Sequence, residues 1–223
     1  GRPRDVEDTW ILTMEDKRKG FALGPFSRRE MDKKCGRGLW RPMTSFVVTQ
    51  ATGKKRRIDN AKRALHNMFV RLLETIFTIS AEWVAEVAML YCTILSAMSD
   101  MLSPLSADDY ELEMGTDDLP DAYRGCPVHP EDAKASIIAV WSPEENAYVY
   151  FRLFALVFGI ASAVVNFNRL PTLLTATHRR LFLVATAAYF DDIPTMDMAI
   201  GRGSAQRMVR KSLTLIGAKP SPD

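Results

Sequence analysis

The sequence predicts an α+β fold, because strand-like and helical segments are mixed along the chain without a regular β-α-β alternation. The 223 residues are 47% hydrophobic and 25% charged, which is typical of a globular protein and excludes wholesale disorder. The uncharged run between Arg152 and Arg169 is shorter than the roughly 20 apolar residues that a membrane helix needs. We therefore expect one globular domain, or a large domain with a smaller lobe, and no membrane span.

Net charge and cysteine content limit the possible binding partners and the cellular compartment of the protein. Lys and Arg number 29 and Asp and Glu 27, a net charge of +2, so any surface for nucleic acid must be local. The three cysteines are an odd number without a C-x-x-C pair, which argues against a disulfide framework or a zinc site. A reducing intracellular compartment, cytoplasm or nucleus, is the expectation, and the charged N-terminus has no signal-peptide core.

The first sixty residues predict a charged extension followed by a β-hairpin. Residues 1–40 are punctuated by glycine turns and are expected to form an N-terminal extension. Residues 45–50 are β-prone, residues 51–53 form a turn, and residues 54–59 return as a second strand. We expect the exposed edge of this hairpin to carry a compact positive patch, with an ordinary solvated turn as the alternative.

A helical segment is expected next. Apolar residues recur at three- and four-residue steps from about residue 61 to residue 101. A segment of this length is too long for one typical helix of a globular protein, so we predict two helices with a break near residues 78–80. The apolar stripe favours a place in the core, although it could instead dock a partner. Residues 107–116 then form an acidic connection with a weak alternating strand.

The second half predicts two more hairpins and two helices. Residues 135–141 and 147–153 are strand-like and are joined by a turn at residues 142–146. A helix is expected over residues 159–177, an apolar strand over 181–190 and its antiparallel return over 193–198. The last element is an amphipathic helix over residues 204–216, with Ser204 as its N-cap and Gly217 at its end.

Acidic residues at two places indicate the chemistry. Asp118 precedes Asp121 in the stretch 117–123, and Asp191 and Asp192 follow the apolar run Phe182–Phe190. Adjacent carboxylates at the end of an apolar hairpin repel one another and lose hydration, and a divalent cation relieves that cost. Hard oxygen ligands suit Mg²⁺ or Mn²⁺, and two ions about 3.5–4 Å apart can activate a hydroxyl and stabilise a leaving pyrophosphate. Asp-Asp also occurs at 108–109 and 117–118, so the dipeptide alone is not specific.

Four motifs in order make residues 40–223 resemble a reverse transcriptase of retrotransposon type, an RNA-directed DNA polymerase. They are the basic segment at residues 55–60, Asp-Leu-Pro-Asp-Ala-Tyr at 118–123 followed by Pro-Val-His-Pro at 127–130, Phe-Gly-Ile-Ala-Ser-Ala at 158–163 with Asn-Phe-Asn-Arg-Leu at 166–170, and Tyr-Phe-Asp-Asp at 189–192. The resemblance implies a right-hand polymerase palm with an antiparallel sheet, fingers elements and a helical insertion over residues 61–103. It places the fingers-like region at residues 41–117 and the palm at 118–223, with the thumb absent.

The resemblance also implies roles for the acidic and aromatic residues. Asp118 and Asp191 would bind two Mg²⁺ or Mn²⁺ ions, and Asp192 would complete the catalytic carboxylates. Tyr123 would lie beneath the sugar and exclude a 2′-hydroxyl, with Phe158 in the same substrate-binding set. Ordinary core packing is the alternative for both aromatic residues.

Further substrate-binding roles follow from the same resemblance. Lys55, Arg56 or Arg57 would neutralise the β- and γ-phosphates of the nucleotide. Gly159 would permit close approach of the nucleotide and template because it has no Cβ. On the template-side helix, Asn168 would take the polar position and Arg169 would contact a backbone phosphate.

The function expected from these motifs is two-metal nucleotidyl transfer from deoxynucleoside triphosphates to a primer 3′-hydroxyl on an RNA or DNA template. Two alternatives remain open: a catalytically inactive nucleic-acid-binding remnant of a retroelement, and a helical protein-interaction module whose partner binds residues 61–101. The strand before Asp118 is more polar than is usual in the family, and no residues remain for a thumb, both of which favour the remnant.

Overall fold

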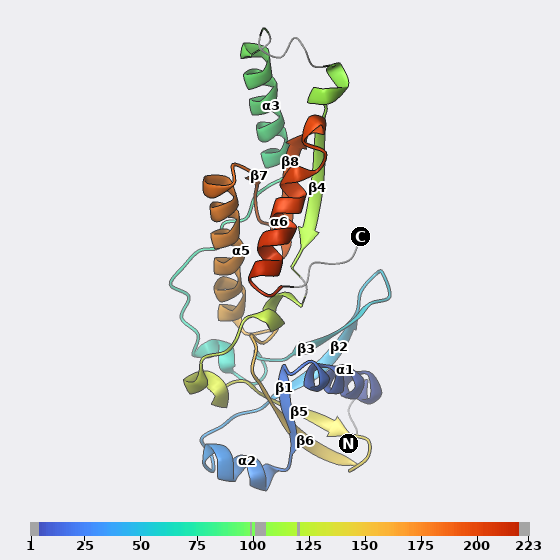
Figure 1. Ribbon diagram of the computed structural model, residues 1–223. Helices are drawn as coiled ribbons and strands as arrows, with labels where there is room; N and C mark the ends of the chain where they lie inside the picture. Colours follow the sequence, from blue (N-terminus) through green and yellow to red (C-terminus); the bar gives the residue numbers. More distant parts are fainter. Residues whose placement is uncertain (1–4, 99, 101–105, 120, 219–223) are drawn as a thin grey trace. The chain divides into compact units, whose positions relative to one another are not determined.

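The structure is a computed structural model that describes residues 5–98, 100, 106–119 and 121–218 (Figure 1). It has the predicted α+β composition, with five α-helices, one mixed five-stranded sheet and one antiparallel three-stranded sheet among the described residues. The chain forms two compact units, each built from two separate segments. Unit 1 comprises Gly1–Glu74 and Tyr123–Asn166, and unit 2 comprises Thr75–Ala122 and Phe167–Asp223.

Unit 1 is built on the five-stranded sheet, in the order β1-β6-β5-β2-β3. The strands are β1 (Ala22–Phe26), β2 (Met43–Thr49), β3 (Lys55–Asp59), β5 (Ile137–Ser142) and β6 (Ala147–Leu153). The predicted hairpins β2-β3 and β5-β6 are both confirmed as antiparallel pairs. The two hairpins are joined by a short parallel pairing, in which Met43 lies opposite Ile138.

Residues 5–40 fold as part of unit 1. They form α1 (Val6–Arg18), β1 and α2 (Arg28–Cys35). Trp10 and Met14 of α1 pack against the buried core of the sheet, where the rings of Trp10 and Phe151 meet edge to face with centroids 6.0 Å apart. Helix α2 begins with a capping box, in which Ser27 and Glu30 each accept a hydrogen bond from the other's backbone N–H.

Unit 2 contains the three-stranded sheet, in the order β4-β8-β7. Its strands are β4 (Leu112–Asp118), β7 (Ala185–Thr186) and β8 (Asp192–Met198), and its helices are α3 (Glu82–Ala97), α6 (Ser204–Leu215) and most of α5 (Ala161–Leu181). The return strand predicted at 193–198 is confirmed as β8. The apolar strand predicted over 181–190 is wrong except for β7, because α5 continues to Leu181 and Leu183 then turns with a positive φ of 55°.

The predicted pair of helices over residues 61–101 is wrong in its first half. Residues 61–65 form turns and residues 66–68 a single 3₁₀ turn, and between residues 61 and 81, all of which the structure describes, there is no α-helix. Asn67 explains the difference within unit 1, since its amide donates to the Gly159 carbonyl at 2.9 Å and accepts from the Ala161 N–H at 2.9 Å. These tertiary bonds outweigh the local helical preference of the segment.

The apolar stripe of α3 does not lie in the core, contrary to expectation. None of the residues of α3 is buried, and Met89 and Leu90 are 68% and 58% exposed. The contact of α3 with the sheet of unit 2 includes the Tyr91 hydroxyl, 3.5 Å from the Met196 carbonyl oxygen. Within the described part of the chain, no helix combines the length and apolarity required to cross a membrane.

Helix α6 is capped by a residue that its own sequence does not reveal. The predicted N-cap, Ser204, is instead the first helical residue, and Gly203 precedes it with a φ of 71°. The cap comes from β8, where Asp197 Oδ2 accepts from the Ala205 N–H at 3.2 Å and from the Ser204 hydroxyl at 3.0 Å. A carboxylate at this end also complements the helix dipole.

Replacing Asp197 with alanine is expected to lower the free energy of unfolding by about 0.5–2 kcal/mol, because the first turn of α6 loses its acceptor. Asp197→Asn keeps an acceptor oxygen and should lose less. Chemical denaturation of both variants measures the effect, with Ser204→Ala as the control for the hydroxyl alone. Wild-type stability of Asp197→Ala would show that the cap contributes nothing.

Candidate functional site

The sheet of unit 2 brings the two predicted acidic motifs together. β4 and β8 pair antiparallel over seven residues, and the last pair of the ladder is Asp118 opposite Asp192. Residues directly opposite each other in an antiparallel pair project to the same face of the sheet. Asp118 and Asp192 are both exposed, so carboxylates 74 positions apart in the chain (192 − 118) share one solvent-facing surface. The expectation that the two motifs meet in one antiparallel sheet is confirmed.

A tight turn presents the second motif. Tyr189 and Asp192 exchange backbone hydrogen bonds of 2.9 and 3.0 Å, leaving Phe190 and Asp191 as a two-residue loop. Phe190 has a φ of 54°, which is uncommon for a bulky residue and marks a backbone held by its surroundings. The carbonyl of Asp191 accepts from the Leu119 N–H at 2.9 Å, which ties this loop to the residue after Asp118.

The alternation of β4 separates two adjacent aspartates. Asp117 projects to the opposite face from Asp118 and is buried, and its Oδ1 lies 2.7 Å from Nε of Arg210 on α6. Its Oδ2 is also buried and makes no hydrogen bond. Asp117 therefore forms a buried ion pair with α6, and Asp118 lies on the exposed face of the sheet beside the Tyr-Phe-Asp-Asp turn. Sequence reasoning did not identify Arg210, because nothing local links α6 to β4.

The carboxylates beside this turn carry unfavourable charge. Although Asp192 is exposed, neighbouring atoms partly desolvate its carboxyl group; this partial burial is the first cause that raises its pKa, and the negative charge of Asp191 is the second. Asp118, Asp191 and Asp192 supply the hard oxygen donors that Mg²⁺ and Mn²⁺ prefer, so the donor set fits these ions in kind. Among the described residues, no three His, Cys, Asp or Glu side chains already lie close enough to enclose an ion.

Asp191→Asn is expected to lower the pKa of Asp192, because it removes the neighbouring negative charge. The pKa should remain above its ordinary value, since burial is the larger cause. A titration of the Asp192 carboxyl carbon followed by NMR measures this, with the distant Asp108→Asn as control. The raised pKa means that the folded chain holds this proton more tightly than the unfolded chain, so stability from this site is lost as pH rises through the carboxyl range. An unchanged pKa of Asp192 in Asp191→Asn would show that the charge of Asp191 does not affect the Asp192 carboxyl group.

The basic residues expected to bind phosphate separate within unit 1. Strand alternation places Lys55, Arg57 and Asp59 on one face of β3 and Arg56 on the other. Lys55 is exposed and forms an ion pair of 2.6 Å with Asp8 of α1, and Arg56 is exposed and donates to Gln50. The side chain of Arg57 is only 3% exposed, so the predicted positive patch is wrong for this residue.

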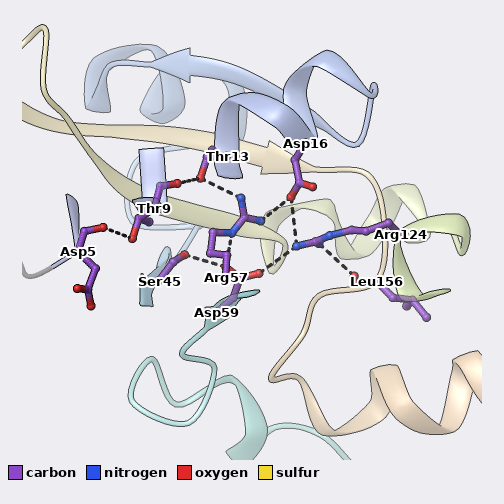
Figure 2. Close-up of polar contacts among 9 residues, drawn as sticks. All are labelled: Asp5, Thr9, Thr13, Asp16, Ser45, Arg57, Asp59, Arg124 and Leu156. Atoms are coloured by element: carbon purple, nitrogen blue, oxygen red, sulfur yellow. Dashed lines mark hydrogen bonds and ion pairs between the residues drawn. The ribbon is translucent and has the colours of Figure 1, made fainter. Parts of the chain in front are cut away.

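Arg57 belongs to a buried group of charges, which we call the charge cluster and which consists of Asp16, Arg57, Asp59 and Arg124 (Figure 2). Asp16 Oδ2 lies 2.8 Å from Nη2 of Arg57 and 3.3 Å from Nη2 of Arg124. Asp59, fully buried, lies 3.1 Å from Nε of Arg57 and 3.6 Å from Nη2 of Arg124. The two positive charges of the arginines and the two negative charges of the aspartates cancel. This matters because burying a charge without an opposite partner is strongly unfavourable.

Polar groups extend the charge cluster into the surrounding elements. Ser45 of β2 donates to Asp59 at 2.7 Å, and Arg57 Nη1 donates to the Thr13 hydroxyl of α1 at 2.9 Å (Figure 2). Arg124 Nη1 donates to the carbonyl of Leu156 at 3.3 Å. Burial lowers the pKa of Arg124, and the negative charge of Asp59 is the largest effect in the opposite direction. The charge cluster thus joins α1, the β2-β3 hairpin and the segment after Tyr123.

The two aromatic residues predicted to bind substrate, Tyr123 and Phe158, lie beside the charge cluster in unit 1. The rings of Tyr123 and Phe158 are tilted against each other with centroids 4.5 Å apart, and the guanidinium of Arg124 lies 5.7 Å from the centre of the Phe158 ring. The Asp59 N–H donates to the Phe158 carbonyl at 3.3 Å. At Gly159, with a φ of 106°, a Cβ would lie 2.1 Å from the Asp59 carbonyl oxygen, so this glycine is required by the protein's own backbone.

The remaining predicted residues lie on α5 in unit 2. Asn168 is half-buried and Arg169 is exposed. Sequence reasoning missed Asp16 and Arg124 as members of the charge cluster. Arg57 and Asp59 stand two apart on a strand and so share a face, which is the one signal in the sequence that could have indicated their pairing.

Neither a scan against protein-family models nor a search of the curated proteins finds a match to this chain.

Proposed function

We propose that this chain is an RNA-directed DNA polymerase of retroelement type, with fingers and a right-hand palm, which adds deoxynucleotides to a primer 3′-hydroxyl on an RNA or DNA template. The observation that carries the proposal is the register of β4 and β8, which sets Asp118 opposite Asp192 beside the turn that presents Asp191. Two strands with carboxylates at their adjoining ends form an antiparallel platform suited to phosphoryl transfer. The four sequence motifs, taken in order, supply the rest of the argument.

The chain's own residues have distinct roles in this proposal. Asp118, Asp191 and Asp192 would hold two Mg²⁺ or Mn²⁺ ions, which supply charge neutralisation at the attacking hydroxyl and the leaving pyrophosphate. Lys55 and Arg56, exposed on the β2-β3 hairpin, would bind the triphosphate, whereas Arg57 is already committed to the charge cluster. Tyr123 would pack under the sugar, and Asn168 and Arg169 would contact the template strand.

Primer extension on an oligo(dT)-primed poly(rA) template with Mg²⁺ or Mn²⁺ tests the proposal. We expect extension by the wild-type chain and its loss, by roughly a thousandfold, in Asp191→Asn, because the carboxylate acts on charge that develops in the transition state. Asp108→Asn is the matched control, since Asp108 is an exposed aspartate of another Asp-Asp pair outside the site. It should extend primers like the wild type.

Three outcomes of this experiment would contradict the proposal. Extension that persists in Asp191→Asn would come from a contaminant. Equal loss in Asp108→Asn would show that the effect is not specific to the turn. A wild-type chain that binds primer-template but never extends it would identify the nucleic-acid-binding remnant instead.

One observation favours a second candidate, a helical protein-interaction module. Several apolar side chains of α3 are exposed, including Met89, Leu90 and Ile94. Met89→Glu combined with Leu90→Glu should then leave the melting temperature unchanged and abolish binding of any protein partner. A large fall in the melting temperature would show that the stripe is core, and this candidate would fail.

A further inference from the structure

We propose that the charge cluster positions Tyr123 against Phe158 and thereby sets sugar discrimination, so that Asp59 and Arg124 are positioning residues rather than ligands of the nucleotide. The inference rests on the proposed function for its consequence, but its structural basis lies wholly within unit 1. The sequence resemblance assigns Lys55, Arg56 or Arg57 to the triphosphate, and it gives no individual role to Asp16, Asp59 or Arg124. The geometry points to a different role for this group.

The charges of the cluster are directed at one another. Arg57 places its Nη2 2.8 Å from Asp16, its Nε 3.1 Å from Asp59 and its Nη1 at hydrogen-bond distance from Thr13. Its side chain is 3% exposed, and that of Arg124 is 8% exposed. A buried guanidinium that already faces two carboxylates gains little from a phosphate, because it would first have to give up those partners. The cluster is therefore a structural support.

The support reaches the aromatic pair by two routes. Through the side chain, Asp59 and Asp16 hold Arg124 (Figure 2). Arg124 follows Tyr123 in the chain and lies over the Phe158 ring. Through the backbone, the Asp59 N–H holds the Phe158 carbonyl, and the Asp59 carbonyl lies against Gly159 with no room for a side chain. Both members of the Tyr123–Phe158 pair are thus anchored to Asp59.

Anchoring matters because exclusion of a single hydroxyl depends on ring position. A tyrosine that rejects a 2′-hydroxyl by steric contact must stay in place when a ribonucleotide presses on it, and packed residues that cannot shift provide that resistance. A displacement of about 1 Å can change a reaction rate by roughly a hundredfold. Loosening Arg124 should therefore weaken the choice of sugar before it weakens nucleotide addition itself.

The test uses a charge-balanced double variant, Arg124→Gln with Asp16→Asn, which removes one cation and one anion and leaves Arg57 paired with Asp59. We expect its preference for deoxynucleotides over ribonucleotides to fall about tenfold, toward that of Tyr123→Ala. Arg124→Lys, which keeps the charge but not the planar fork, should recover part of the preference. Arg152→Gln is the matched control, because Arg152 also lies over a phenylalanine in unit 1, Phe154 at 5.4 Å, and should leave the preference unchanged.

A second readout does not depend on polymerase activity. Hydrogen exchange at the backbone amides of residues 122–126 and 156–160 should accelerate in the double variant and not in Arg152→Gln. Unchanged exchange would overturn the positioning role, and an unchanged sugar preference in an active double variant would overturn its consequence. If the wild-type chain extends no primer, the proposed function and the sugar assignment fail together, and hydrogen exchange still decides whether the cluster holds the pair.

Discussion

Asp59→Ala should lower the free energy of unfolding by about 3–5 kcal/mol, as expected when one partner of a buried ion group is removed. The fully buried carboxylate accepts from Ser45 at 2.7 Å and lies near both guanidinium groups of the charge cluster. Without it, two buried cations would share the single carboxylate of Asp16. Because burial already disfavours the charged form of Arg124, the loss of Asp59 leaves that charge with less compensation.

Urea denaturation of two single variants, Asp59→Ala and Asp8→Ala, tests this expectation when their free energies of unfolding are compared. Asp8 forms an ion pair with Lys55 at 2.6 Å, shorter than any distance that Asp59 makes to a guanidinium, but both side chains of that pair are substantially exposed. An exposed pair contributes about 0–1 kcal/mol, so Asp8→Ala should be nearly neutral. Similar losses of unfolding free energy in the two variants would contradict this expectation. They would mean that the buried charge cluster stabilises the fold no more than the exposed Asp8–Lys55 pair does.

Gly159→Ala should destabilise unit 1 by about 3 kcal/mol or more, because two separate costs add at this position. A φ of 106° is unfavourable for any residue with a Cβ, and the new methyl group would meet the Asp59 carbonyl oxygen at 2.1 Å. The neighbour is backbone in a strand and cannot rotate away. The carbonyl of Gly159 also accepts from Asn67, so a shift of residue 159 would disturb that bond as well.

Gly20→Ala separates the two costs. Gly20 has a φ of 83° in the same unit, but no atom lies within 4 Å of the position of its Cβ. It should therefore show the dihedral cost alone, about 1–2 kcal/mol, and the difference between the variants measures the steric part. Thermal unfolding provides the comparison. Equal effects in both variants would contradict the close approach of Gly159 to Asp59.

The secondary structure that was predictable from sequence is the part determined by local pattern. The β2-β3 and β5-β6 hairpins have β-prone residues on both sides of turn residues, and both form as expected. The segment from residue 61 to residue 81 has helical periodicity but lacks the helix, and around the 3₁₀ turn at residues 66–68 Asn67 bonds to Gly159 and Ala161 instead. Partners more than ninety residues away are invisible to a local pattern.

The candidate site was predictable only where the pairing of two strands could be anticipated. The meeting of the two acidic motifs in one antiparallel sheet was predicted, but the register that sets Asp118, the last residue of β4, opposite Asp192, the first residue of β8, was not. The charge cluster was not predictable, because Asp16 and Arg124 are brought to Arg57 by packing of α1 and of the segment after Tyr123. A run of four basic residues looks like a solvated surface until strand alternation and a covering helix bury one of them.

The split of unit 1 into Gly1–Glu74 and Tyr123–Asn166 has a consequence for synthesis on the ribosome. The parallel pairing of β2 with β5 joins residues 95 positions apart (138 − 43). The close contact of the Asp59 carbonyl with Gly159 likewise cannot form until residue 159 has been synthesised. The elements α1, β2 and β3 therefore leave the ribosome before β5 and β6, the strands that complete their sheet. Long-range pairings of this kind form slowly. During that interval the nascent chain exposes Met43, which is fully buried once the sheet is complete, beside a strand edge that lacks its partner, and such partly folded states are prone to aggregation.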